Sequence, residues 1–206
     1  MLKSIIINVS FERVWWFLNF FCVGFLLLAI QFNFSYAYCF IMKIIGLLFL
    51  VGGIWEMPDY KNEYKKLYKP IAICMSLSLI TIICFILFQF VDTKFVLQIF
   101  QVTMGTLVTI LTLLIQNKIV KLLLKDDNLI DCSANIIELQ RSWKKLMFFT
   151  ALSVAFNIIN IIPVRIVMDI SALLMAVSRI IMYIFAIVVV VKLVKVRNDY
   201  YRNIKI

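Results

Sequence analysis

The stretch from residue 71 to residue 91 reads IAICMSLSLITIICFILFQFV and contains no Asp, Glu, Lys or Arg. A helix rises 1.5 Å per residue, so a run of this length reaches across a hydrocarbon core of roughly 30 Å. In lipid, backbone N–H and C=O groups find hydrogen-bond partners only within their own segment or in a closed barrel. The stretch therefore predicts a membrane-spanning α-helix.

The rest of the chain has the same character. Of its 206 residues 64% are apolar and 16% charged, with a mean hydropathy of +1.02, whereas soluble domains are about 45–50% apolar and about 25% charged. We predict an all-α, polytopic integral membrane protein with a single membrane domain over residues 1–206 and a bundle of six transmembrane helices. The six apolar blocks are Val14–Gln31, Ala37–Trp55, Ile71–Val91, Phe95–Gln116, Leu146–Ile162 and Ser171–Val191.

Basic residues lie mainly on one side of these blocks. They are frequent before the first block, between the second and third, in the hairpin 117–145 and in the tail 192–206, whereas the other side holds only Lys94 and Arg165. Basic loops stay on the cytoplasmic side. We therefore expect both termini, the hairpin and the tail in the cytoplasm, and a multi-pass protein of the cell (inner or plasma) membrane.

The net charge of +10 needs no nucleic acid to explain it. Bases at the inner face are attracted to anionic lipid head groups by about 1 kcal/mol each, so we expect a lipid partner and no direct nucleic-acid binding. In the polar stretch EMPDYKNEYKKLYKP (56–70), Tyr60, Tyr64 and Tyr68 recur every four residues. This spacing predicts one aromatic face of a helix lying at the membrane interface.

The cytoplasmic hairpin offers a candidate surface for a partner. Its sequence, NKIVKLLLKDDNLIDCSANIIELQRSWKK (117–145), predicts an extension of the fourth span, a turn at KDDN and a helix that leads into the fifth span. Ile136, Leu139 and Trp143 fall at helical spacing and are the candidate docking residues for a soluble cytoplasmic protein. The alternative is that this hairpin only floats at the interface.

A comparison of the chain with itself indicates an internal repeat. A shift of 136 residues places KIIGLLFL from Lys43 over RIIMYIFA from Arg179, and KNEYKK from Lys61 over RNDYYR from Arg197. A basic residue at equal depth and a matching Asn-acid-Tyr are less common by chance than apolar matches. We predict that the second and sixth helices are copies of one unit, since both run from outside to inside.

Two charges fall inside predicted spans, at Lys43 and Arg179. A charge at the centre of a span costs about 2.5–3.5 kcal/mol on insertion scales, and intramembrane charges usually face protein or water. Two interpretations are open: the side chains snorkel towards the outer head groups, or they enter a pocket.

Polar side chains along the fourth and fifth spans favour a pocket. Gaps of three and four residues place them on one face of each helix, where packing between helices is the alternative explanation. An outward-facing pocket with two buried bases could hold an anion, or the two bases could pair with Asp92 and Asp169 at the outer rim. The candidate outer pocket comprises Lys43, Gln98, Gln101, Asn157, Asn160 and Arg179.

Catalytic chemistry is not expected. The chain contains no histidine, which excludes His-based proton transfer and the Ser-His and Cys-His nucleophile pairs. The five cysteines form no C-x-x-C pair and are expected to pack as small apolar residues, and the five glycines form no phosphate loop. We expect no enzyme activity, no cofactor and no metal.

Two functions fit these features. The first is a non-enzymatic membrane subunit, expected to form homo-oligomers, which anchors a soluble cytoplasmic effector or senses the envelope, as in a stress, immunity or phage-defence system. The second is a binding or uptake component for a small anionic solute, with its site in the outer half of the bundle. Uninterrupted helices and the many cytoplasmic bases favour the first function, whereas Lys43 and Arg179 favour the second.

Overall fold

A computed structural model describes residues 2–29, 36–56, 62–88, 94–125, 129, 133–162 and 164–204. Within these residues the chain is all-helical and contains no strand, as the sequence predicts. Each of the six apolar blocks overlaps a separate long helix. The helices are α1 (Leu2–Ala29), α2 (Tyr36–Glu56), the one-turn α3 (Asn62–Lys65), α4 (Tyr68–Phe88), α5 (Lys94–Leu123), α6 (Ser133–Ile159) and α7 (Arg165–Ile204).

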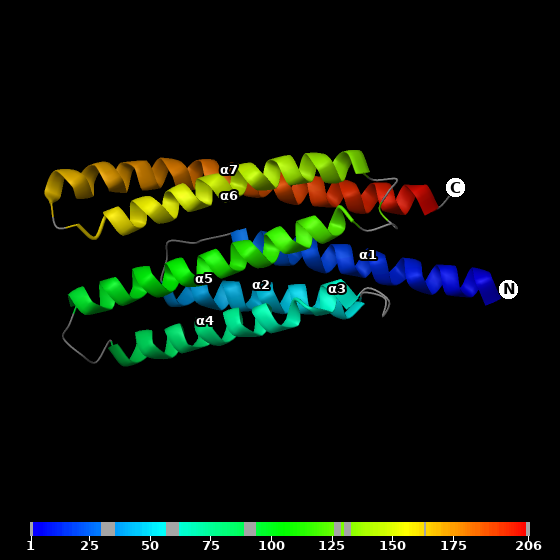
Figure 1. Cartoon of the computed structure of the whole chain (residues 1–206), viewed down its shortest axis with the longest axis horizontal. Helices are drawn as coiled ribbons and strands as arrows, with labels where there is room; N and C mark the ends of the chain where they lie inside the picture. Colours follow the sequence, from blue (N-terminus) through cyan, green and yellow to red (C-terminus); the bar gives the residue numbers. More distant parts are fainter. Residues whose placement is uncertain are drawn as a thin grey trace.

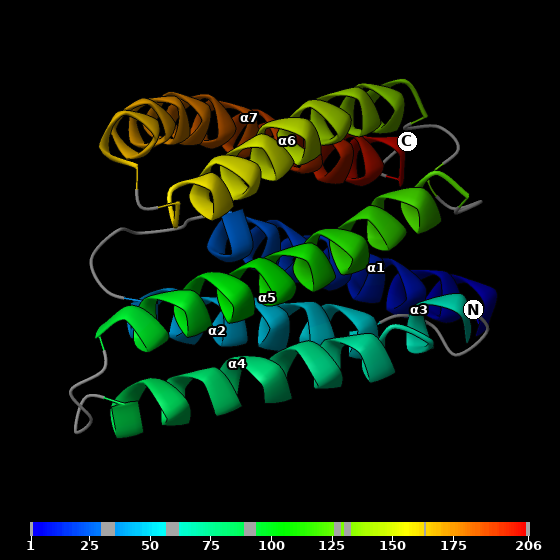
Figure 2. The same ribbon diagram turned by 60° about the vertical axis from the view of Figure 1, so that its left-hand side comes forward.

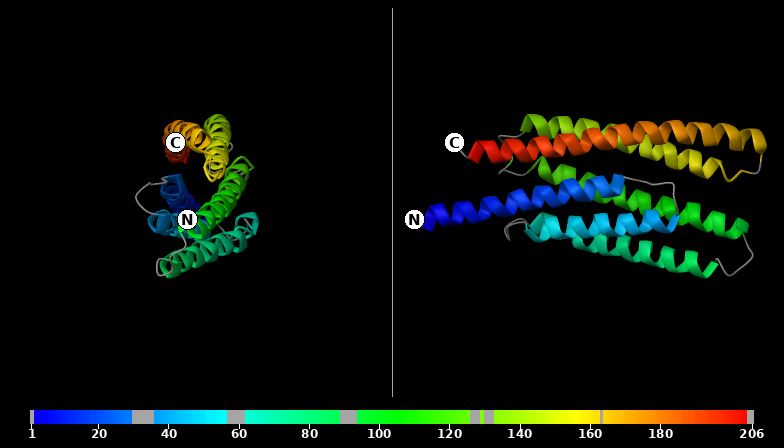
Figure 3. Two further views of the ribbon diagram at one scale, coloured as in Figure 1. Left: turned by 90° about the vertical axis from the view of Figure 1, so that its left-hand side faces the viewer. Right: turned by 180° about the vertical axis from the view of Figure 1, so that it is seen from behind.

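The six long helices form a closed ring. Neighbours in the chain pack side by side, and α7 packs back against α1. The helices run along the long axis of the molecule, and the end-on view in Figure 3 shows α6 and α7 on one side of the ring and α2 and α4 on the other. The short α3 lies beside one end of α5 (Figure 2). Both termini lie at that same end (Figure 1).

The helix ends follow local sequence signals. Pro70 lies in the first turn of α4, where its missing N–H has no partner to lose. Pro58 follows the end of α2 in the sequence, and residues before proline disfavour the helical conformation. As expected for the hairpin, α5 continues beyond Gln116, and α6 begins well before Leu146.

The polarity of the molecule is inverted with respect to a soluble bundle. The buried polar residues include Ser78, Thr112, Thr150 and Lys43. Large aliphatic side chains face outward on several helices, and more than a third of each side chain is exposed. On α4 and α7 they include Ile80, Ile83, Leu87, Leu173, Ile180, Ile184 and Ile187.

Within the described part of the chain, four helices are long and apolar enough to cross a membrane by length and composition, and they comprise Tyr38–Glu56, Glu63–Leu87, Val96–Leu123 and Arg165–Arg202. The apolar part of α1, Arg13–Leu28, is shorter. In α6 charged side chains continue as far as Lys145, so the uncharged part is confined to the second half of the helix. The length and composition of the helices thus support four of the six predicted spans, and the spans in α1 and α6 stay predictions.

Glycines bring α1 and α2 into close contact. A Cβ added at Gly24 would lie 3.0 Å from the carbonyl oxygen of Gly46, and one added at Gly53 would lie 2.7 Å from the ring of Phe21. Neither glycine has a positive φ, so proximity and not backbone conformation requires the small residue. Small residues at such contacts let two helices approach closely.

The inner face of α1 is aromatic. Phe17, Phe21 and Phe25 are fully buried or nearly so, and Phe17 makes an edge contact with Tyr64, with ring centroids 5.3 Å apart. Tyr64 is itself buried under the Phe17 ring of α1, so it does not belong to an exposed aromatic face as the spacing predicts. Tyr60 lies outside the described residues.

The predicted repeat of α2 and α7 has a partial counterpart in the structure. The shift of 136 residues relates buried Leu50 to buried Ala186, and buried Tyr64 to buried Tyr200. The two regions differ in that α7 is one continuous helix, whereas α2 ends at Glu56 and Tyr64 belongs to α3. A common origin of the two helices therefore stays a prediction.

Candidate functional site

Lys43 lies on α2 and points into the ring. Only 7% of the residue is exposed. Its Nζ donates a hydrogen bond of 2.8 Å to Oγ1 of Thr109 on α5 and lies 5.6 Å from the centre of the Phe40 ring. Such a ring attracts a cation through its negative face. The side chain thus bridges α2 and α5 inside the molecule.

A small cavity adjoins this bridge. Its volume is about 20 Å³, measured at the positions available to the centre of a water molecule. Five of the six long helices contribute to its wall, so the cavity lies within the ring and not between a single pair of helices. It is lined by Leu28, Lys43, Thr109, Thr112, Leu113, Gln116, Leu146, Thr150 and Met182.

The polar wall of the cavity comes mainly from α5. Thr109, Thr112 and Gln116 are separated by three and four residues, so they lie on one face of the helix, and all three are buried. Thr150 adds a hydroxyl from α6, and Cys74 of α4 lies 3.5 Å from the hydroxyl oxygen of Thr112. The stripe of polar residues in the sequence thus becomes one side of the cavity.

The hydroxyl protons of two threonines are already used. Thr112 donates to the carbonyl oxygen of Val108 at 2.7 Å, and Thr150 donates to that of Leu146 at 2.8 Å. A Ser or Thr inside a helix commonly forms this bond to the carbonyl four residues earlier. The bond leaves the hydroxyl oxygens of Thr112 and Thr150 as acceptors towards the cavity.

The positive charge of Lys43 is poorly compensated. No carboxylate among the described residues lies within 4 Å of its Nζ; the ion pairs of the described chain, Lys66 with Glu63 and Lys192 with Glu138, involve other bases. Burying an ammonium ion costs several kcal/mol even after relaxation, whereas a hydrogen bond that involves a charged group contributes about 1.5–3 kcal/mol. The site is therefore suited to a negative ligand.

Arg179, the second predicted base of the pocket, does not line the cavity. It is half-buried on α7, and Met182, one turn further along, lines the cavity instead. Arg179 and Lys43 both lie within electrostatic range of Cys39 on α2. The two bases are thus near one side of α2, but only Lys43 enters the wall of the cavity.

The four amides of the predicted pocket also lie elsewhere. Gln98 is exposed, whereas Gln101 and Asn157 are half-buried. Asn160 accepts a hydrogen bond of 3.1 Å from Ser171 at the start of α7. None of the four lines the cavity. The structure brings Lys43 together with Thr109, Thr112, Gln116 and Thr150, which the sequence analysis placed on polar faces without assigning them to the site.

The candidate docking residues lie in the interior. Ile136, Leu139 and Trp143 are buried, with exposures of 0–1%. The Trp143 ring packs edge-on against Phe25 of α1, with centroids 5.6 Å apart, and its Nε1 donates to Oδ1 of Asn117 at 3.3 Å. These side chains join α6 to α1 and α5 and offer no surface to a partner in this arrangement, so they do not form the predicted docking surface.

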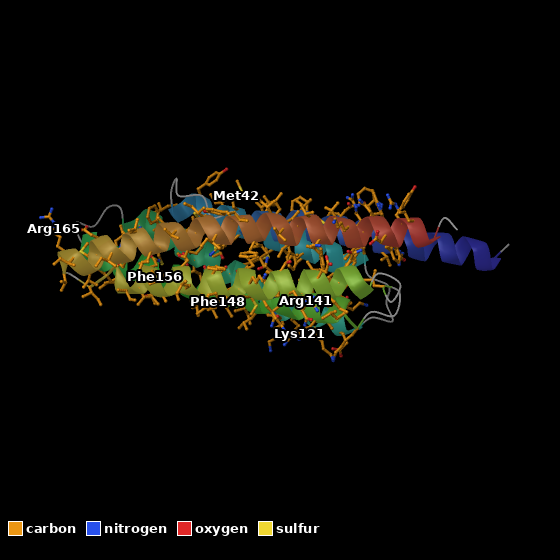
Figure 4. All side chains as sticks on the ribbon, turned by 90° about the horizontal axis from the view of Figure 1, so that it is seen from above. Met42, Lys121, Arg141, Phe148, Phe156 and Arg165 are labelled. Carbon is orange, nitrogen blue, oxygen red and sulfur yellow. The ribbon has the colours of Figure 1, made fainter. Side chains whose placement is uncertain are left out.

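Bases remain exposed at the end of the molecule that carries both termini. Lys121 of α5 and Arg141 of α6 lie on one side of the half nearer that end, and Arg165 lies at the opposite end (Figure 4). Glu138 lies near them, and the hydrogen bond from the Lys192 ammonium holds the pKa of its carboxyl below the usual range. This end carries the surface that suits anionic lipid head groups.

Among the described residues, no group of three or more His, Cys, Asp or Glu side chains could hold a metal ion. Cys132 lies outside the described part of the chain, and the cysteines within it are free thiols. Comparisons with protein families, curated proteins and solved structures gave no match for this chain. The function is therefore argued from the site alone.

Proposed function

We propose that this chain is a multi-pass membrane protein whose helix ring binds a small anionic solute at Lys43. The observation that carries the proposal is the position of this base, which is buried beside a cavity of hydroxyl and amide groups and has no carboxylate partner among the residues that the structure describes. Intramembrane charges that face the interior of a bundle usually mark a ligand or ion site.

The inverted polarity supports the membrane location. Ile83 and Ile180 face outward while Ser78 and Thr150 are buried, as expected if lipid and not water surrounds the ring. We propose six crossings, with α1 and α6 spanning by their apolar parts, and both termini in the cytoplasm. The basic residues beside the termini support this orientation.

Binding of a solute is better supported than anchoring of a soluble effector. The candidate docking residues of the anchoring hypothesis, Ile136, Leu139 and Trp143, are covered by other helices. The exposed bases at the same end fit the head groups of anionic lipids without any protein partner. We propose binding without catalysis, since the chain contains no histidine and the cavity wall contains no acid.

Reporter fusions test the proposed topology. A reporter after Ile206, or one inserted near Asn62, should be active only in the cytoplasm, and one between Gln31 and Tyr36 should be active only outside. Activity of the C-terminal fusion outside the cytoplasm would refute the six-span arrangement.

Anion-dependent stabilisation tests the proposed binding. The reconstituted protein should unfold at a higher temperature when it is given the right anion from a panel of chloride, nitrate, acetate, phosphate and sulfate, because a ligand that binds only the folded state stabilises it. Lys43→Met should abolish this shift, whereas Lys118→Met, which removes an exposed base of α5, should preserve it. Equal shifts in the two variants for every anion would refute binding at Lys43.

A further inference from the structure

We infer that the ligand is one dehydrated monovalent anion of halide size, held by Lys43, Thr109 and Gln116. This inference rests on the proposed function and specifies its ligand. Three properties of the cavity lead to it: its volume, its net charge and the direction in which each polar group can donate a proton.

The volume favours a small anion. About 20 Å³ is available to the centres of water-sized particles, and a single water needs about 10–15 Å³ on this measure. A chloride or bromide ion is only slightly larger than a water molecule. Acetate, phosphate and sulfate have four or five heavy atoms, so they would require the ring to expand.

The charge of the wall matches one negative charge. Lys43 is the only ionisable side chain among the described residues that line the cavity, and Arg179 stands outside this wall. A monovalent anion neutralises Lys43, whereas a divalent anion would leave a net negative charge buried. Buried charges that are not paired are strongly unfavourable.

The hydrogen-bond directions provide donors for an anion. The Lys43 ammonium has three N–H groups and gives one to Thr109. Because Thr109 accepts this bond, its own hydroxyl proton remains to donate. Gln116 is buried at the cavity, and its amide makes no hydrogen bond to another described residue. These three groups can all point an N–H or O–H at the same ion.

Thr112 and Thr150 are not among the proposed ligands. Thr112 and Thr150 spend their protons on helix carbonyls, so they contribute no donor to an anion. The proposed ligands are therefore a selected part of the wall and not every polar residue in it. This distinction predicts different effects for variants of Gln116 and Thr150.

The experiment measures halide binding to the full chain reconstituted in nanodiscs, in a gluconate buffer because gluconate is too large for the cavity. Unfolding temperature is followed against added chloride or bromide, and the line width of the ³⁵Cl NMR signal reports chloride binding directly. The variants Lys43→Met and Gln116→Leu keep side-chain size, Thr150→Val removes a hydroxyl of the wall that is not a proposed donor, and Lys118→Met and Gln98→Leu serve as controls. Lys43→Gln is the second variant in case Lys43→Met does not fold.

Chloride and bromide should stabilise the wild-type protein in a saturable manner. Both variants of Lys43 should weaken halide affinity at least tenfold and Gln116→Leu several-fold. The two controls should change it less than twofold, and Thr150→Val should not weaken it. In gluconate alone, Lys43→Met should be at least as stable as the wild type, since it removes a buried charge that no carboxylate among the described residues neutralises.

Each contrary outcome has a separate meaning. If acetate, phosphate or sulfate stabilises the protein through Lys43 and halides do not, the halide inference is overturned and the proposed function stands. If no anion acts through Lys43, both are overturned. If halide shifts persist in Lys43→Met, the effect arises from salt at the surface, and the assignment of the cavity is overturned.

Discussion

Replacing Gly53 by alanine tests the close packing of α1 against α2. The added Cβ would lie 2.7 and 2.8 Å from two ring carbons of Phe21 and 3.3 Å from the carbonyl oxygen of Phe17. The Phe21 ring has little freedom to move, because it is fully buried and lies 4.2 Å from the Phe17 ring, centroid to centroid. The methyl group must therefore push the two helices apart or strain the ring.

Gly105 on α5 provides the matched control, since a Cβ added there meets no atom within 4 Å. Glycine to alanine inside a helix gains up to about 1 kcal/mol from helix propensity, whereas overpacking a core costs about 1–3 kcal/mol. Both variants gain helix propensity, and only Gly53→Ala overpacks the core. Gly53→Ala should therefore be less stable than Gly105→Ala by about 1–3 kcal/mol.

The free energy of unfolding can be measured by titration of SDS into mixed micelles, with tryptophan fluorescence as the signal. Reversibility is checked by diluting the SDS. If Gly53→Ala is as stable as Gly105→Ala, the Phe21 ring can move aside, and the argument that glycine is needed for the approach of α1 and α2 fails.

Three further predictions use the same unfolding assay. Arg197 donates a hydrogen bond of 2.8 Å to Asn19 across the contact of α7 with α1. A double-mutant cycle of Arg197→Gln and Asn19→Ala should therefore give a coupling energy of about 1.5 kcal/mol. A coupling energy near zero would show that this bond does not stabilise the contact. Trp143→Ala should lower the free energy of unfolding by about 3–5 kcal/mol, because the ring is in the core. Trp143→Phe should lower it by about 1 kcal/mol, because it removes the hydrogen bond to Asn117. A loss below about 1 kcal/mol for the alanine variant would place Trp143 at a surface. The pKa of Glu138 is lowered by the hydrogen bond from Lys192, so its contribution to stability is present above the pKa of the unfolded chain and disappears as the pH falls through the lowered value. Glu138→Gln should flatten this acid-dependent part of the stability curve between pH 7 and pH 3, and an unchanged curve would show that the pair contributes nothing.

The apolar blocks located the helices well where hydrophobicity and helicity end together. The block Ala37–Trp55 differs from α2 by one residue at each end. The block Ser171–Val191 covers only the middle of α7, which extends from Arg165 to Ile204. Lysine and arginine favour helices almost as strongly as leucine, so a helix continues through basic residues after the hydropathy has fallen.

The site was only partly predictable, because residues at equal distances from the starts of two helices lie at equal depth only if both helices start at the same level. Lys43 lies seven residues after the start of α2, whereas Thr109 lies fifteen residues after the start of α5, which correspond to about 10 and about 22 Å at 1.5 Å per residue. The first turns of α5 reach further than those of α2 (Figure 1). The polar stripe was therefore visible in the sequence, but counting from span ends paired Lys43 with Gln98 and Gln101 instead of Thr109.

The candidate docking residues illustrate a second limit. The spacing of Ile136, Leu139 and Trp143 identifies an apolar face of a helix. Periodicity does not say what covers such a face. Here the cover includes Phe25 of α1, which is distant in the sequence, and only the closure of the ring brings the two together.

The closure of the ring by α7 against α1 has a consequence for biosynthesis. Asn19 and Arg197, which join at this contact, are 178 residues apart. A ribosome that adds 5–20 residues per second takes about 10–35 s to cover that distance. During this interval the face of α1 that will receive α7 has no cover from its own chain, and Lys43 already belongs to a completed α2. Nascent chains that stop before Arg165 never cover this face of α1. We therefore expect them to be substrates for membrane proteases or for chaperones that shield unpaired helices.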